Sequence, residues 1–172
     1  MKPGTTSGLV LITALVMLLI LTLLGISGSQ MMVLHLRMAG NLHQMHQAFQ
    51  AAEAALRDGE HHIANHIDQH SVFSPTCEHG LCATSTLDAT PWNTAPVDWQ
   101  TGKNTIVYGS TTGTPALPGN NRQPRYIIER LPTPNTEPLD DSAPIHHWYR
   151  VTAVSYTAHG SIQHILQSTY RR

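Results

Sequence analysis

Charged residues are scarce in this chain. Only 12% of its 172 residues are charged, and 10 lysines and arginines nearly balance 11 aspartates and glutamates, for a formal net charge of -1. No cluster of basic residues occurs, so the sequence lacks the electrostatic footprint of a nucleic-acid-binding protein. We therefore expect no nucleic acid among the partners.

The sequence also lacks the short motifs of common enzymes and cofactor sites. It contains no G-x-S-x-G turn, no glycine-rich phosphate loop and no H-E-x-x-H motif. Three of its 12 histidines, His62, His66 and His70, would share one face of a helix and could present imidazoles to a metal. No carboxylate that would orient these imidazoles is identifiable. The better interpretation is that the three histidines are polar side chains that face the solvent. We expect no catalytic residue, cofactor or metal.

Cysteine is nearly absent, because only Cys77 and Cys82 occur. Their spacing excludes a C-x-x-C redox pair. If this part of the chain is exported to an oxidising compartment, a local disulfide worth ~2 kcal/mol is the natural expectation. Free thiols and metal ligation are the alternatives.

One long stretch has almost no ionisable group. Between Pro3 and Leu36 the only such side chain is His35, and the eighteen residues from Leu9 to Ile26 carry no charge. At ~1.5 Å per residue this run nearly matches a ~30 Å hydrocarbon core. It exceeds the apolar region of a signal peptide, and no A-x-A-like cleavage site follows. We predict a segment that stays in the protein and can sit in a membrane; an ordinary N-terminal anchor fits this segment alone equally well.

After Arg37 the apolar pattern becomes one-sided. Apolar or small residues recur in alternating steps of four and three, which is typical of an amphipathic helix. They are Met38, Leu42, Met45, Phe49, Ala52, Leu56, Gly59 and Ile63. We favour packing of this face on a sheet over a free coiled coil, and turn formers from Ser71 to Pro75 end the helix. The predicted helix covers residues 31–70.

The remainder is predicted to be a loop region at 71–103 and a sheet at 104–172. The loop region holds Trp92 and Trp99, which we expect to cover a small core rather than bind a partner. Four prolines between Pro132 and Pro144 indicate a surface loop.

Strand patterns occur in four places within the predicted sheet. They are Asn104–Tyr108, Arg125–Leu131, His147–Thr157 and Ser161–Tyr170. The last two runs predict a hairpin. Alternation leaves open which of its faces points inward, one being Trp148, Arg150, Thr152, Val154 and Tyr156 and the other Tyr149, Val151 and Ala153.

Both ends of the chain resemble one protein family. The leader-like Met1–Gly8 resembles that of type IV prepilins, which is cut after a glycine. The run Leu34–Glu60, with MAGN at 38–41 and AFQAAEAALR at 48–57, resembles the N-terminal region of PilX-type minor pilins, and the closing hairpin is similar to theirs. The resemblance implies an α+β, pilin-like fold, with a long N-terminal helix packed on a small antiparallel sheet.

The same resemblance implies a structural role in type IV pilus assembly or initiation, and no enzyme activity. A prepilin peptidase would remove residues 1–8 by cleaving between Gly8 and Leu9, and Leu9 would be N-methylated. Residues 9–30 would span the inner membrane and later join the pilus core, and residues 31–172 would form a periplasmic domain. The implied partners are other minor pilins and the pilus tip protein.

One position departs from the pilin pattern. Type IV pilins usually carry glutamate at the fifth residue after the leader, and this chain has Thr13 there. Because that glutamate is linked to docking a subunit on its neighbour, its absence suits a subunit near the fibre tip. The alternative is a permanently anchored single-pass inner-membrane protein whose extracytoplasmic domain binds a partner.

Overall fold

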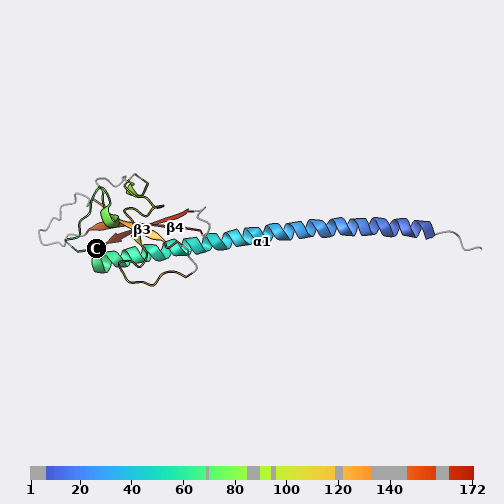
Figure 1. Cartoon of the computed structure of the whole chain (residues 1–172), viewed down its shortest axis with the longest axis horizontal. Coiled ribbons are helices and arrows are strands. Elements are labelled where there is room, and N and C mark those ends of the chain that lie inside the picture. The colour runs from blue at the N-terminus through green and yellow to red at the C-terminus, as the bar shows by residue number, and fades with distance from the viewer. Residues whose placement is uncertain are drawn as a thin grey trace, which may run out of the picture. The chain divides into compact units, whose positions relative to one another are not determined.

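The computed structural model describes residues 7–68, 70–84, 90–93, 96–118, 122–132, 147–157 and 163–172. In these ranges the chain forms one long α-helix, α1 (Ser7–His66), and five strands. The strands are β1 (Leu81–Ala83), β2 (Ile106–Val107), β3 (Arg125–Arg130), β4 (Trp148–Tyr156) and β5 (Gln163–Arg171). Short 3-10 turns lie at Glu78–Gly80 and Pro91–Asn93. This is the predicted α+β, pilin-like arrangement (Figure 1).

The chain divides into two units, Met1–His43 and Gln44–Arg172. In the first unit every described side chain from Gly8 to His43 is exposed. The helix contains an 18-residue window of mean hydropathy 3.0, none of it buried, and is long and apolar enough to cross a membrane. It stays helical through Gly25 and Gly28, although glycine weakens a helix by about 1 kcal/mol relative to alanine.

In the second unit the strands form a mixed sheet of order β1-β3-β4-β5, and β2 also pairs with β3. The β2–β3, β3–β4 and β4–β5 pairs are antiparallel, whereas β1 runs parallel to β3. The small sheet, predicted to be antiparallel, is therefore mixed, with the parallel β1–β3 pair at one edge. Parallel pairing needs a long connection, and the chain between Ala83 and Arg125 supplies it. The predicted loop region accordingly contains a strand.

The predicted hairpin is confirmed, since β4 and β5 pair over nine residues from Trp148↔Arg171 to Tyr156↔Gln163. Within the described residues the second strand runs from Gln163 to Arg171; residues 161 and 162, where it was predicted to begin, lie outside them. The first predicted sheet strand is shorter than expected, at Ile106–Val107. Most of the predicted proline loop lies outside the described residues.

The sheet face toward α1 carries the main core. Tyr149, Val151 and Ala153 of β4 belong to it, so this face packs on α1, whereas Thr152 and Val154 are buried on the other face. Side chains from β2, β3 and the segment after α1 complete the core. Its members are Ala55, Ile63, Ile67, Phe73, Ile106, Tyr126, Ile128, Tyr149, Val151 and Ala153. In Figure 1 the C-terminal part of α1 lies along β3 and β4.

The predicted amphipathic stripe is buried only in part. Ala52 and Ile63 are fully buried, whereas Met45 and Phe49 stay 39% and 43% exposed. Close packing depends on small residues, because a Cβ at Gly59 would lie 2.6 Å from Cγ1 of Val151. The helix can approach the sheet this closely only with glycine there.

The opposite face of the sheet is covered by the disulfide-closed turn that leads into β1 and by residues between β1 and β2. Cys77, Cys82, Val97 and Trp99 pack there against Ile127 and Val154. The Trp99 indole donates a hydrogen bond to the carbonyl oxygen of Trp92 at 2.8 Å. The tryptophans therefore cover a small core, as predicted.

The helix ends at His66, four residues before the predicted end. Asp68 and Ser71 form a local turn, in which the Ser71 hydroxyl donates to the Asp68 carboxylate at 3.0 Å. Such side-chain bonds compete with the helix. The last carbonyls are satisfied from the far end of the chain, because Arg172 Nη1 donates to the oxygen of Ile63 at 2.6 Å and also to that of Ile67.

Candidate functional site

The predicted processing site lies in the first turn of α1. Gly8 and Leu9 are helical there, and Leu9 is 72% exposed. A side chain at Gly8 would meet no atom within 4 Å. Residues 1–6 of the predicted leader lie outside the described part of the chain.

Thr13 presents no charge in this segment. Its hydroxyl donates to the carbonyl oxygen of Val10 at 3.0 Å, and Thr22 bonds to Leu19 in the same way at 2.8 Å. Polar groups in hydrocarbon must be satisfied within the segment, and these two hydroxyls are. The helix therefore offers an uncharged apolar surface to lipid or to another helix.

In the second unit, Cys77 and Cys82 form the predicted disulfide. Both cysteines are fully buried, and their Cα atoms are 4.1 Å apart. Cys77 and His79 adopt left-handed backbone conformations, with φ of 56° and 53°. The closed turn leads directly into β1.

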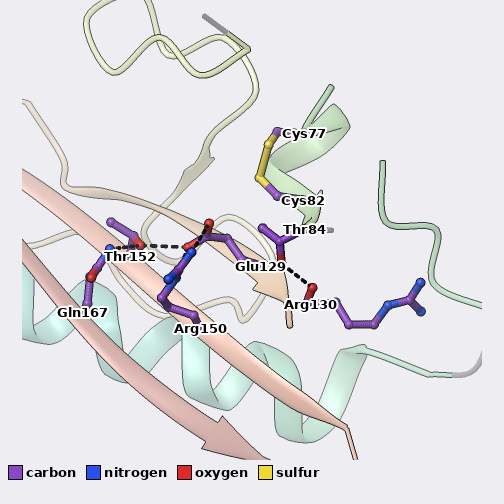
Figure 2. Close-up of polar contacts among 8 residues, drawn as sticks. All are labelled: Cys77, Cys82, Thr84, Glu129, Arg130, Arg150, Thr152 and Gln167. Atoms are coloured by element: carbon purple, nitrogen blue, oxygen red, sulfur yellow. Dashed lines mark hydrogen bonds and ion pairs between the residues drawn. A yellow bond between two sulfur atoms is a disulfide. The ribbon is translucent and has the colours of Figure 1, made fainter. Parts of the chain in front are cut away.

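Beyond the disulfide, β1 is secured to β3 by backbone and side-chain contacts. Leu81 lies opposite Ile128 in the parallel register. The Thr84 hydroxyl then donates to the carbonyl oxygen of Arg130 at 2.7 Å (Figure 2). The disulfide turn is thus held to the sheet at its edge.

A buried ion pair lies on the disulfide side of the sheet (Figure 2). Glu129 is fully buried and accepts two bonds from Arg150, from Nε at 2.8 Å and from Nη2 at 3.0 Å. The Thr152 hydroxyl donates to the same carboxylate at 3.2 Å and accepts from Gln167 at 3.0 Å. Such a paired, hydrogen-bonded charge holds the strands in register.

We did not predict this pair, although the sequence carried a signal. Glu129 follows three apolar residues of a strand, and Arg150 lies within another apolar strand. Only the β3–β4 register, in which Glu129 lies directly opposite Arg150, shows that the two charges meet.

Asp58 joins α1 to the segment that follows β2. Helix periodicity places it outside the apolar stripe, which would leave it exposed, but it is only 5% exposed. Its carboxylate accepts bonds from the Gly109 amide at 2.9 Å and from the Thr114 hydroxyl at 3.2 Å, and a third from Thr112. These contacts bring the 109–114 segment over the helix.

The prediction that His62 faces the solvent was also wrong. It is 8% exposed, and its Nδ1 lies 3.1 Å from the hydroxyl of Tyr126. Burial lowers the pKa of His62, the neighbouring His66 and His61 lower it further, and Asp58 opposes them. Burial, and then the Asp58 carboxylate, raise the pKa of Tyr126 far above its usual value.

His62, His66 and His70 do not form a cluster on one face of the helix. His66 is exposed, with its ring 5.8 Å from that of His62, and His70 lies beyond the end of the helix. Within the described ranges, no three His, Cys, Asp or Glu side chains are grouped so that they could hold a metal ion.

Two family models match the chain. The PilX N-terminal model matches residues 7–57, and the model described as type IV pilus assembly protein PilX C-term matches residues 78–172. The chain belongs to the PilX family. Neither the curated proteins nor the solved structures include a significant match to it.

Membership in the PilX family confirms the resemblance seen at both ends of the sequence. The protein is a minor pilin associated with type IV pilus assembly, and it interacts with other pilus components. The PilX match also fits a membrane-anchored pilin with an apolar N-terminal helix. Asp58 and His62 lie between the two matched ranges.

Proposed function

We propose that this PilX-family protein takes part in pilus assembly or initiation from a position near the fibre tip. The observation that carries the proposal is the exposed apolar segment from Leu9, with an uncharged Thr13 at its fifth position. Type IV pilins usually carry a glutamate at this position, and that glutamate is linked to docking a subunit on its neighbour. A subunit that lacks it can end a stack of subunits more readily than it can continue one.

The proposal includes processing and a change of surroundings. A prepilin peptidase removes residues 1–8 by cutting between Gly8 and Leu9, and the new N-terminus at Leu9 is methylated. Residues 9–30 first lie in the inner membrane and then enter the helical core of the fibre. This transfer changes the hydrophobic free energy little, because lipid and helix bundle are both apolar.

The same proposal places residues 31–172 outside the cytoplasm. This domain faces the periplasm before assembly and the fibre surface afterwards, and its partners are other minor pilins and the tip protein. A buried disulfide supports this location, because disulfides persist in oxidising compartments.

Processing is tested by intact mass and N-terminal sequencing of protein from membranes of cells with and without prepilin peptidase. We expect Leu9 as the N-terminus only when the peptidase is present. An intact Met1 in both strains would sink the processed-pilin proposal. It would favour a permanently anchored inner-membrane protein with a partner-binding domain.

Tip placement needs a separate test. Sheared pili are labelled with gold-conjugated antibody against the native protein, and label at one end of the fibres is expected. Label distributed along the shaft would contradict a tip position while leaving pilin processing intact.

A further inference from the structure

A pocket of about 520 Å³ lies where α1 ends beside the sheet. Its lining residues are Ile67, Asp68, Phe73, Arg130, His147, Tyr149 and Arg172. The volume is typical of ligand sites, and no role described above uses this pocket.

Apolar and aromatic side chains that line the pocket are buried. Ile67, Phe73 and Tyr149 are each at most 9% exposed. The guanidinium carbon of Arg130 lies 4.9 Å from the centre of the Phe73 ring. This cation–π contact holds the guanidinium of an otherwise exposed arginine over the ring.

Among the described residues that line the pocket, two are arginines and one is an aspartate. Arg130 and Arg172 both act on the Tyr149 hydroxyl, since they lower its pKa against the larger, raising effect of burial. Among the described residues, no ion pair joins either arginine to a carboxylate.

Among the described residues that line the pocket, Asp68 is the acidic one, and its carboxylate is bound by its own turn. Asp68 accepts hydrogen bonds from the Ser71 hydroxyl and from the His70 amide, both at 3.0 Å. Its charge remains close to the pocket and disfavours a doubly charged ligand such as a phosphate monoester. A singly charged, planar carboxylate suits the guanidinium fork better.

We propose that this pocket binds an acidic peptide segment of a partner protein. A carboxylate of the segment pairs with Arg130 at the rim, and a neighbouring apolar side chain lies on Phe73 and Tyr149. This proposal does not depend on pilin processing or on a position at the fibre tip. Its test can therefore fail while those proposals hold, and the reverse.

The test uses the full-length protein in detergent micelles and two peptides, measured by isothermal titration calorimetry. The first peptide is acetyl-Gly-Phe-Asp-Leu-Gly-amide, and the second has Asn in place of Asp. We expect the Asp peptide to bind about ten-fold more tightly than the Asn peptide. Arg130→Gln is expected to abolish this preference, and Arg130→Lys to reduce it, because lysine keeps the charge without the planar fork.

Arg171→Gln is the matched control. Arg171 also lies over an aromatic ring, with its guanidinium carbon 5.9 Å from the Trp148 ring centre, but it does not line the pocket. This variant should keep the Asp preference.

Equal affinity for the two peptides, or no binding of either, would overturn the proposal even if an Arg130 variant failed to fold. An unchanged preference in Arg130→Gln would overturn it as well. If an equal concentration of inorganic phosphate displaced the Asp peptide, the pocket would be a general anion site, and the proposal of a peptide site would be wrong.

Discussion

At the scale of single residues, the buried Glu129–Arg150 pair is the largest departure from an apolar core. Replacing Glu129 by Gln removes the charge that offsets the guanidinium, whose side chain is 17% exposed. Breaking a buried pair from one side costs about 3 kcal/mol. We expect Glu129→Gln to lower the free energy of unfolding by that order, measured by urea titration of tryptophan fluorescence.

An exposed ion pair provides the control for this prediction. Glu53 accepts a bond from Arg57 at 2.6 Å, but their side chains are 44% and 75% exposed. A solvent-exposed pair contributes roughly 0.5 kcal/mol, so Glu53→Gln should have little effect. Equal destabilisation by the two substitutions would show that burial of Glu129 does not matter.

His62 makes stability depend on pH. Its lowered pKa means that the folded state holds the neutral ring, while the unfolded chain takes up a proton below about pH 6.5. The unfolded state then binds more protons, so stability rises with pH. Between about pH 7.5 and about pH 5.5 the urea midpoint should fall, and His62→Gln should reduce that fall.

The control for His62 is His46→Gln, because His46 is exposed on the same helix. It should leave the pH dependence of the urea midpoint as it is in the native protein. If His62→Gln kept the native dependence, the pH effect would have to come from other groups.

At the scale of elements, Gly59 sets the distance between α1 and the sheet. An added Cβ would lie 2.6 Å from Val151 and 3.2 Å from the Tyr126 ring. Overpacking of this kind costs about 1–3 kcal/mol, which exceeds the roughly 1 kcal/mol gained in helix propensity. We expect Gly59→Ala to lower the urea midpoint.

Gly40 is the matched helical glycine, because a Cβ there would meet no atom within 4 Å. Gly40→Ala should leave the urea midpoint of the tryptophan signal unchanged or higher. A drop similar to that of Gly59→Ala would argue against the packing explanation.

The long elements could be predicted because their patterns extend over many residues. The apolar run from Leu9, the stripe through Ile63 and the β4–β5 hairpin all follow from hydrophobic periodicity. The three-residue β1 could not be found this way, since alternation is not visible over three residues. Its pairing depends on a disulfide turn and a partner strand that lies far along the chain.

The polar contacts at Asp58 and His62 were missed for a different reason. Helix periodicity assigns residues to an apolar or a polar face, and it places Asp58 on the polar one. The 109–114 segment covers that residue, and Tyr126 of β3 contacts His62. These contacts join residues more than fifty positions apart, so the local pattern does not contain them.

At the scale of the whole molecule, the two units are held by different interactions. From Gln44 onward α1 is stabilised by packing on the sheet, where Ala52, Ala55 and Ile63 are fully buried. From Leu9 to Leu36 its side chains are exposed and mostly apolar. In lipid or detergent this part keeps its helix, because only internal hydrogen bonds can satisfy its backbone.

The protein in micelles should therefore unfold in two separable steps. Urea should remove the near-ultraviolet circular dichroism of the second unit, which contains all three tryptophans, while part of the far-ultraviolet helix signal persists. Non-coincident transitions are the signature of more than one cooperative unit. Gly59→Ala should shift the near-ultraviolet midpoint without changing the residual helix signal. Loss of both signals together at one urea concentration would show that the apolar part of α1 depends on the folded domain for its helix.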